Sequence, residues 1–255
     1  MELSSRTHQR LMPARAYVEG ALRRTDHKTR FLIITSGRAG SELLVTLLNS
    51  HPQIACDGEF LMEKLRWPER FLEGRAALAY RNGKDAYGVK MLPQHIFDVQ
   101  ELKDSAEWAR HLAQRGWHII RLRRDNRLHQ AISMVRAAKT AWHYRAPDVG
   151  TFQPIEVDVM QLIGTMYVIE WLEHQIDELL EGTEHLSLTY EDDLETEEHQ
   201  ARTVDRICAM LHLEPAATSS ELVRVHPRQT REMITNYDEV VAELLRNRFA
   251  GEISE

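Results

Sequence analysis

The stretch that decides the fold is Phe31-Leu32-Ile33-Ile34-Thr35-Ser36-Gly37-Arg38-Ala39-Gly40-Ser41-Glu42-Leu43-Leu44. Its first four residues form a short apolar run, which is typical of a strand buried within a parallel sheet. The two glycines predict a tight turn after that strand. Four leucines between residues 43 and 48 recur on one face of a helix, which should end before His51-Pro52 because proline disfavours a helical residue in front of it. The stretch therefore predicts a strand, a turn and a helix in direct succession.

Three further apolar runs predict strands at residues 87–92, 117–122 and 185–190, and helical stretches separate each from the next. Strands that alternate with helices are typical of a parallel sheet with helices on both faces. We therefore expect an α/β fold. The longest helical pattern covers residues 155–181, and we expect its apolar stripe to pack in the core: Met160, Ile163, Tyr167, Trp171 and Ile176.

The size and composition of the chain suit one large core. It has 255 residues, of which 43% are hydrophobic and 28% are charged, as in ordinary globular proteins. We find no internal repeat and no linker, which predicts a single domain over residues 1–255 with its core at 31–240. Residues 6–24 have the pattern of a basic amphipathic helix, so residues 1–28 are expected to form an N-terminal helical extension.

Charge and composition also limit the kinds of partner that we expect. The chain has 32 Lys+Arg against 39 Asp+Glu and a formal net charge of −7, so we expect no nucleic-acid partner. No apolar stretch approaches the roughly 18 residues of a membrane span, and the N-terminus lacks the apolar core of a secretory signal. We therefore expect a cytoplasmic protein without a membrane span. Cys56 and Cys208 are the only cysteines, which predicts reduced thiols and no structural metal.

The turn after the first strand is suited to binding an anion. A glycine turn that enters a helix offers backbone N–H groups and the positive end of the helix dipole, and Arg38 adds a cation. The P-loop of nucleoside triphosphatases requires G-x-x-x-x-G-K-[ST]. Aligning Gly40 with the second glycine places Thr35, Ser41 and Glu42 where that motif has glycine, lysine and a hydroxyl residue, so three of four defining positions differ. The dinucleotide-binding motif G-x-G-x-x-G is also absent.

The turn resembles instead the first loop of sulfotransferases that use 3′-phosphoadenosine 5′-phosphosulfate (PAPS). That loop reads basic-x-Gly-Ser/Thr-x-Leu-Leu, and residues 38–44 fit it. The segments that follow, residues 47–54 and 57–60, are similar to bacterial carbohydrate sulfotransferases of the nodulation-factor and trehalose types. The family also has a strand that ends in arginine and a following helix with a serine, and residues 119–133 match this element. All further matches lie at residues 47–54, 57–60, 188–192 and 234–240.

The resemblance implies a three-layer P-loop-like fold, with PAPS as co-substrate, 3′,5′-ADP as product and no metal. Arg124 and Ser133 are expected to hold the 3′-phosphate that distinguishes PAPS from ATP, with Arg123 and Arg127 as alternatives to Arg124. Glu42 departs from the family pattern of a threonine or small polar residue, and it either faces the donor or points outward. The residues expected to bind the donor at the turn are Ser36, Gly37, Arg38, Ala39, Gly40, Ser41 and Glu42.

The implied reaction moves a sulfuryl group to a hydroxyl of a carbohydrate or a small metabolite. Arg38 is expected to stabilise the charge that develops on the donor. Glu59 is the first candidate for the general base, with Glu42, Lys90 and His95 as alternatives. Lys90 is expected to contact sulfate or acceptor, or else to bury its stem with its head in water.

Other residues and functions stay open. Trp142 either stacks on an acceptor ring or packs in the core, and Arg228 and Arg231 either close over the nucleotide or are exposed. Loops at residues 59–87 and 146–153 are expected to set the acceptor, but they carry no diagnostic motif. The sequence does not indicate an oligomeric state. The alternative functions are a nucleotide kinase or NTPase with a degenerate P-loop, and a non-catalytic nucleotide-binding protein of the same fold.

Overall fold

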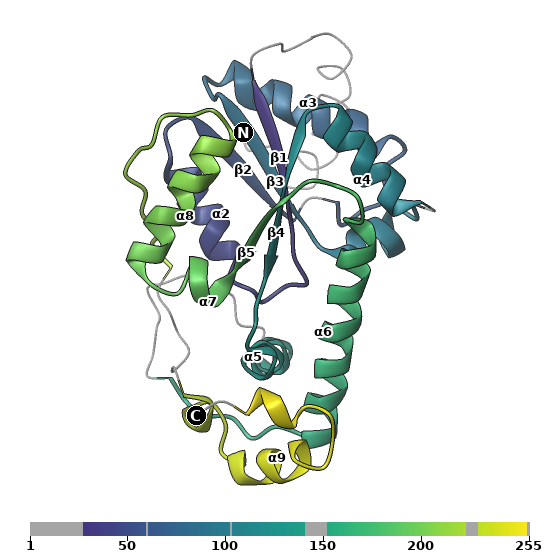
Figure 1. The fold of residues 1–255 in the computed structure, drawn as a ribbon, viewed down its shortest axis with the longest axis vertical. Coiled ribbons are helices and arrows are strands. Elements are labelled where there is room, and N and C mark those ends of the chain that lie inside the picture. Colours follow the sequence, from purple (N-terminus) through teal and green to yellow (C-terminus); the bar gives the residue numbers. More distant parts are fainter. Residues whose placement is uncertain (1–27, 60, 103, 141–151, 223–228, 254–255) are drawn as a thin grey trace, which may run out of the picture.

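Figure 1 shows the computed structural model, which describes residues 28–59, 61–102, 104–140, 152–222 and 229–253. Five parallel strands form a sheet in the order β2-β3-β1-β4-β5. Helices flank this central sheet, so the expected α/β fold is confirmed. The strands are β1 (Thr29–Ile34), β2 (Ile54–Glu59), β3 (Ala86–Met91), β4 (Trp117–Arg123) and β5 (Leu186–Thr189).

The central strand β1 is buried on both faces, which explains its continuous apolar run. Phe31 and Ile33 pack with α2 and α8 on one face of the sheet. Leu32 and Ile34 pack with α3, α4 and the end of α6 on the other face. The helices are α2 (Ser41–Ser50), α3 (Pro68–Arg81), α4 (Ser105–Gln114), α6 (Val159–Leu179) and α8 (Glu197–Met210).

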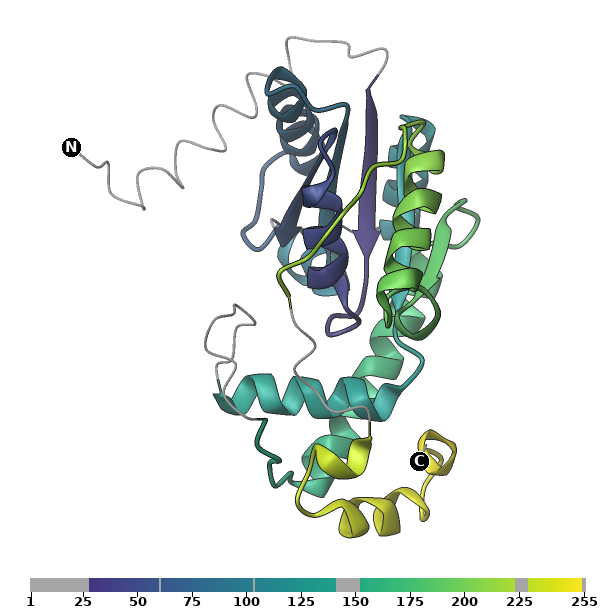
Figure 2. The ribbon, with the colours of Figure 1, turned by 90° about the vertical axis from the view of Figure 1, so that its left-hand side faces the viewer.

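Helix α5 (Arg127–Thr140) crosses beyond the carboxyl ends of the strands (Figure 2). It packs against the first half of α6 and the C-terminal segment in a third apolar cluster. Ligands of open α/β sheets bind outside the carboxyl ends of the strands, and α5 lies on that side. The remaining elements are the π-helix η1 (His95–Val99), α7 (Tyr190–Asp193), the 3-10 turn η2 (Thr230–Glu232), α9 (Tyr237–Leu244) and the 3-10 turn η3 (Ala250–Glu252).

The expected core stripe of α6 is partly wrong. Ile163 and Ile176 are buried, but Met160, Tyr167 and Trp171 are 70%, 43% and 52% exposed. Helix α6 is apolar on more than one face, and the face that packs inward shares only Ile163 and Ile176 with the expected stripe. Its buried residues are Leu162, Ile163, Met166, Ile169, Leu172, Ile176 and Leu179.

Strand β2 was not among the expected strands. Its sequence, Ile54-Ala55-Cys56-Asp57-Gly58-Glu59, lacks an apolar run because β2 lies at the edge of the sheet and only its first half packs inward. The last strand was expected to reach Tyr190, but that residue begins α7. Cys56 and Cys208 are buried and form no disulfide.

Some expectations concern residues outside the described ranges. These are the N-terminal helical extension as far as residue 27, Trp142, most of the loop at 146–153, and Arg228. Within the described ranges, every helix is too short or too polar to cross a membrane.

Candidate functional site

The turn between β1 and α2 has the backbone of an anion-binding loop. Gly37, Arg38 and Gly40 have φ angles of 88°, 55° and 85°, in the left-handed region. Gly40 is the N-cap of α2 and has no side chain that accepts from the first N–H groups of the helix. Backbone N–H groups at such a helix start can bind an anion. The turn therefore has the local geometry that the donor loop requires.

Gly40 also allows a close approach by α7. A Cβ atom built at this position would lie 2.6 Å from Cδ2 of Tyr190. The aromatic ring therefore packs directly on the turn, where only glycine leaves room for it. The contact joins the turn to a segment that lies 150 residues further along the chain.

Helix α5 supplies polar side chains to the same turn. Arg38 Nε donates to Ser133 Oγ at 3.1 Å. Gln130 Nε2 lies 2.9 Å from Ser36 Oγ and 2.6 Å from the Gly37 carbonyl oxygen, and it donates to both. The structure thus brings Ser133 to the predicted donor loop. Gln130 was missed, although it lies one turn before Ser133 on the same helix face.

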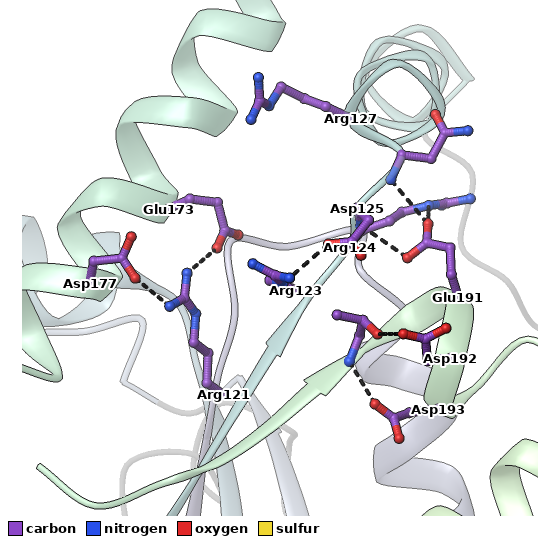
Figure 3. A network of polar contacts seen from close by, with 12 residues as sticks. Arg121, Arg123, Arg124, Asp125, Arg127, Glu173, Asp177, Glu191, Asp192 and Asp193 are labelled. Carbon is purple, nitrogen blue, oxygen red and sulfur yellow. Dashed lines mark hydrogen bonds and ion pairs between the residues drawn. The ribbon is translucent and has the colours of Figure 1, made fainter. Parts of the chain in front are cut away.

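Among the three candidate arginines, Arg124 is the one that faces this site. Burial lowers the pKa of Arg38, and the positive charge of Arg124 lowers it further, against the opposing effect of Glu42 and Glu59. The charges of Arg38 and Arg124 therefore interact, and both side chains contact α5. Arg123 is half-exposed and pairs with Asp125 at 3.2 Å (Figure 3).

Arg127 points elsewhere. Its NH1 lies 3.0 Å from Glu252 Oε1, and its guanidinium is 5.6 Å from the centre of the Phe249 ring. Arg231 is exposed and pairs with Asp238 at 3.1 Å, so it is engaged with α9. The geometry thus favours Arg124 over Arg123 and Arg127 as the arginine expected to bind the same phosphate as Ser133.

Lys90 joins two carboxylates on the other side of the turn. Its side chain is 3% exposed, and Nζ lies 3.1 Å from Glu59 Oε1 and 3.2 Å from Glu42 Oε1. A buried ammonium is costly without such partners. Glu42 therefore turns toward Lys90, although its side chain is 60% exposed. The structure brings three of the four candidate bases together.

His95, the fourth candidate, lies beside Glu59. Its Nδ1 accepts from the Leu92 N–H at 3.3 Å, so the neutral ring carries its proton on Nε2, which is 3.9 Å from Glu59 Oε2. Burial lowers the pKa of His95, Glu59 opposes this shift and Lys90 adds to it. His95 and Glu59 therefore lie close together, at a separation too long for a hydrogen bond.

The segment after β2 is held by a residue that sequence reasoning missed. Gln100, which is buried, accepts from the Leu65 N–H at 3.0 Å through Oε1. Its Nε2 donates to the carbonyl oxygens of Leu61 and Glu63 at 3.2 and 2.8 Å. Gln100 follows η1, so the helix that carries His95 also fixes the chain after Glu59. Nothing in the local sequence marks a glutamine that satisfies three distant backbone groups.

Comparisons with known proteins give a likeness to solved structures. No family profile and no protein of curated function matches the chain. A solved structure to which it is similar is the "Sulfotransferase Domain from the Curacin Biosynthetic Pathway", with 14% sequence identity and a TM-score of 0.42. The match covers 89% of this chain and 83% of that one. At this identity and TM-score, the function has to be argued from the residues of the site.

Proposed function

We propose that the protein transfers a sulfuryl group from PAPS to a hydroxyl of a carbohydrate or small metabolite. The observation that carries this proposal is that Arg38 and Arg124, which follow the adjacent strands β1 and β4, both contact α5. Arg38 donates to Ser133, and Arg124 lies against His129. Two neighbouring guanidinium groups with reduced access to water repel each other, and an anion between them relieves that repulsion. Ser133, which contacts Arg38, adds a hydroxyl donor. This donor set suits a phosphate group.

The bound donor supplies an activated sulfuryl group next to a phosphate that leaves. In the proposed reaction the acceptor oxygen forms a bond to sulfur, and the bond between sulfur and the phosphate oxygen breaks. Arg38 and the N–H groups at the start of α2 stabilise the negative charge that grows on the departing phosphate. Arg124 and Ser133 bind the 3′-phosphate.

Glu59 is placed to take the proton of the acceptor hydroxyl. Lys90 Nζ pairs with Oε1 of this carboxylate at 3.1 Å, and His95 Nε2 lies 3.9 Å from its Oε2. A general base must be positioned as well as basic, and two neighbours from β3 and η1 provide that positioning. Glu42 contacts the same lysine from α2, so it remains the alternative base.

The kinase or NTPase reading finds less support at this site. Ser41 and Glu42 stand where that chemistry needs a phosphate-binding lysine and a metal-binding hydroxyl. The lysine near the turn, Lys90, comes from β3 and is paired with two carboxylates.

Calorimetry with 3′,5′-ADP, 5′-AMP and ATP with Mg²⁺ tests the proposal. We expect 3′,5′-ADP to bind tightest. Because charged hydrogen bonds contribute about 1.5 to 3 kcal/mol each, Arg124→Ala should weaken 3′,5′-ADP by tenfold or more and 5′-AMP little. Arg123→Ala is the matched control, since the neighbouring arginine is exposed and pairs with Asp125. Equal affinity for 3′,5′-ADP and 5′-AMP, or binding of ATP alone, would refute the proposal.

A further inference from the structure

Three consecutive acidic residues, Glu191, Asp192 and Asp193, belong to α7, and the reaction proposed above does not use them. Two of them serve their own segment (Figure 3). Asp192 Oδ2 accepts from the Thr189 hydroxyl at 3.2 Å. Asp193 Oδ2 accepts from the Thr189 N–H at 2.8 Å, and its Oδ1 pairs with Arg206 of α8. The carboxylate of Glu191 contacts a different segment instead.

Glu191 reaches across to the start of α5. Its Oε2 accepts from the Asp125 N–H at 2.9 Å, and its Oε1 accepts from the Asn126 N–H at 3.1 Å. The same Oε1 lies 3.6 Å from Arg124 Nε, an ion pair rather than a hydrogen bond. One carboxylate thus contacts three successive residues between β4 and α5.

Arg124 is restrained on two further sides. Its guanidinium lies 4.6 Å from the centre of the Tyr190 ring, so α7 provides both a charged and an aromatic contact. One terminal nitrogen is 3.5 Å from His129 Nδ1, and His129 Nε2 is 2.7 Å from the Thr230 hydroxyl. The arginine side chain is 10% exposed. Its position is therefore set by α7, α5 and the C-terminal segment together.

These contacts also decide how an anion is bound here. The N–H groups between β4 and α5 are a natural anion site, but Glu191 already occupies those of Asp125 and Asn126. An anion beside Arg124 cannot use these two N–H groups and must be bound there by side chains, so the placement of Arg124 becomes decisive.

We propose that Glu191 is the positioning residue of Arg124: it fixes the segment from Arg124 to Asn126 and sets the guanidinium against Tyr190. The inference rests on the proposed function in naming the 3′-phosphate as the group that Arg124 meets. Glu191 itself does not touch that phosphate, so its effect passes through the arginine. Asp192 has no contact of this kind and should not share the role.

A double-mutant cycle tests this dependence by calorimetry with 3′,5′-ADP and 5′-AMP. Because glutamine lacks the charge and one of the two acceptor oxygens, Glu191→Gln should weaken 3′,5′-ADP by about twofold to 150-fold, the range of coupled neighbours. The loss of 5′-AMP affinity should be smaller. In the Arg124→Ala background, Glu191→Gln should have little further effect. Asp192→Asn is the matched control. An equal loss in both backgrounds would overturn the proposal.

A ligand-free measurement separates this inference from the proposed function. The ¹⁵N spectrum reports the Nε–H group of each arginine, and the Arg124 signal is assigned by its loss in Arg124→Ala. Glu191→Gln should move that signal, whereas Asp192→Asn should not. If the native protein fails to prefer 3′,5′-ADP, the proposed function is wrong and this spectrum alone decides the positioning role. An unchanged Arg124 signal would refute it. Glu191→Asp, which keeps the charge, replaces Glu191→Gln if that variant does not fold.

Discussion

Gly40 is the position at which a single methyl group tests the link between the donor turn and α7. Gly40→Ala places a Cβ atom 2.6 Å from the Tyr190 ring, at a φ angle of +85°. Gly83→Ala is its matched control, because Gly83 has a φ angle of +84° and an added Cβ there meets nothing within 4 Å. The two variants share the backbone strain, and the collision with Tyr190 is what distinguishes them.

The difference follows from two contributions. A left-handed conformation costs a non-glycine residue roughly 1 to 2 kcal/mol, of which alanine regains about 0.4 to 1 through the unfolded chain. Gly83→Ala should therefore lower the free energy of unfolding by about 1 kcal/mol. Overpacking adds about 1 to 3 kcal/mol, so Gly40→Ala should lower it by about 2 to 4 kcal/mol.

Thermal unfolding measures the difference. For a chain of this length, about 2 to 4 °C corresponds to 1 kcal/mol, so Tm should fall by about 2 to 4 °C in Gly83→Ala and about 4 to 16 °C in Gly40→Ala. Since Tyr190 also contacts Arg124, Gly40→Ala should lose part of the preference for 3′,5′-ADP over 5′-AMP. Equal Tm values for the two variants would refute the reasoning, because the Tyr190 ring would then move aside without lowering the free energy of unfolding.

Two further predictions concern turnover. Glu59→Gln should lower kcat by roughly 10² to 10⁴ with nucleotide affinity nearly unchanged, the usual effect of losing a positioned base. Glu42→Gln is the comparison, since both carboxylates contact Lys90, and loss of turnover in that variant alone would assign the base to Glu42. Turnover should persist in EDTA, because the ammonium of Lys90 already lies against both carboxylates; loss in EDTA with rescue by Mg²⁺ would favour the kinase reading.

Local pattern was enough to predict much of the fold. The apolar run before Thr35 and the leucine spacing after Gly40 describe a strand buried on both faces and a helix with one buried face. The pattern was insufficient where burial is partial. Strand β2 lies at an edge, and α6 has apolar residues on several faces, so tertiary contacts decide which residues pack inward. Hydrophobic periodicity alone therefore does not predict which residues of β2 and α6 are buried.

The candidate site was likewise predictable from the sequence only in part. The turn, Arg124 and Ser133 could be named from motifs, because each motif carries its residues at short spacing. The contacts made by Gln130 and Glu191 could not, since they join segments that lie 65 or more residues apart. Their positions become visible only when the sheet order brings β1, β4 and β5 together. The assigned roles stay predictions until the variants are measured.

The charged side chains around the turn between β1 and α2 form two separate groups. Arg38 and Arg124 lie together near α5, whereas Glu42 and Glu59 lie together on Lys90. An anionic donor is attracted to the first group, and a neutral acceptor that must lose a proton is suited to the second. Arg38 interacts electrostatically with both groups, because Arg124 lowers its pKa and both glutamates raise it. In the proposed reaction the sulfuryl group would therefore pass near Arg38, and we expect Glu42, which contacts Lys90, to lie on the acceptor side.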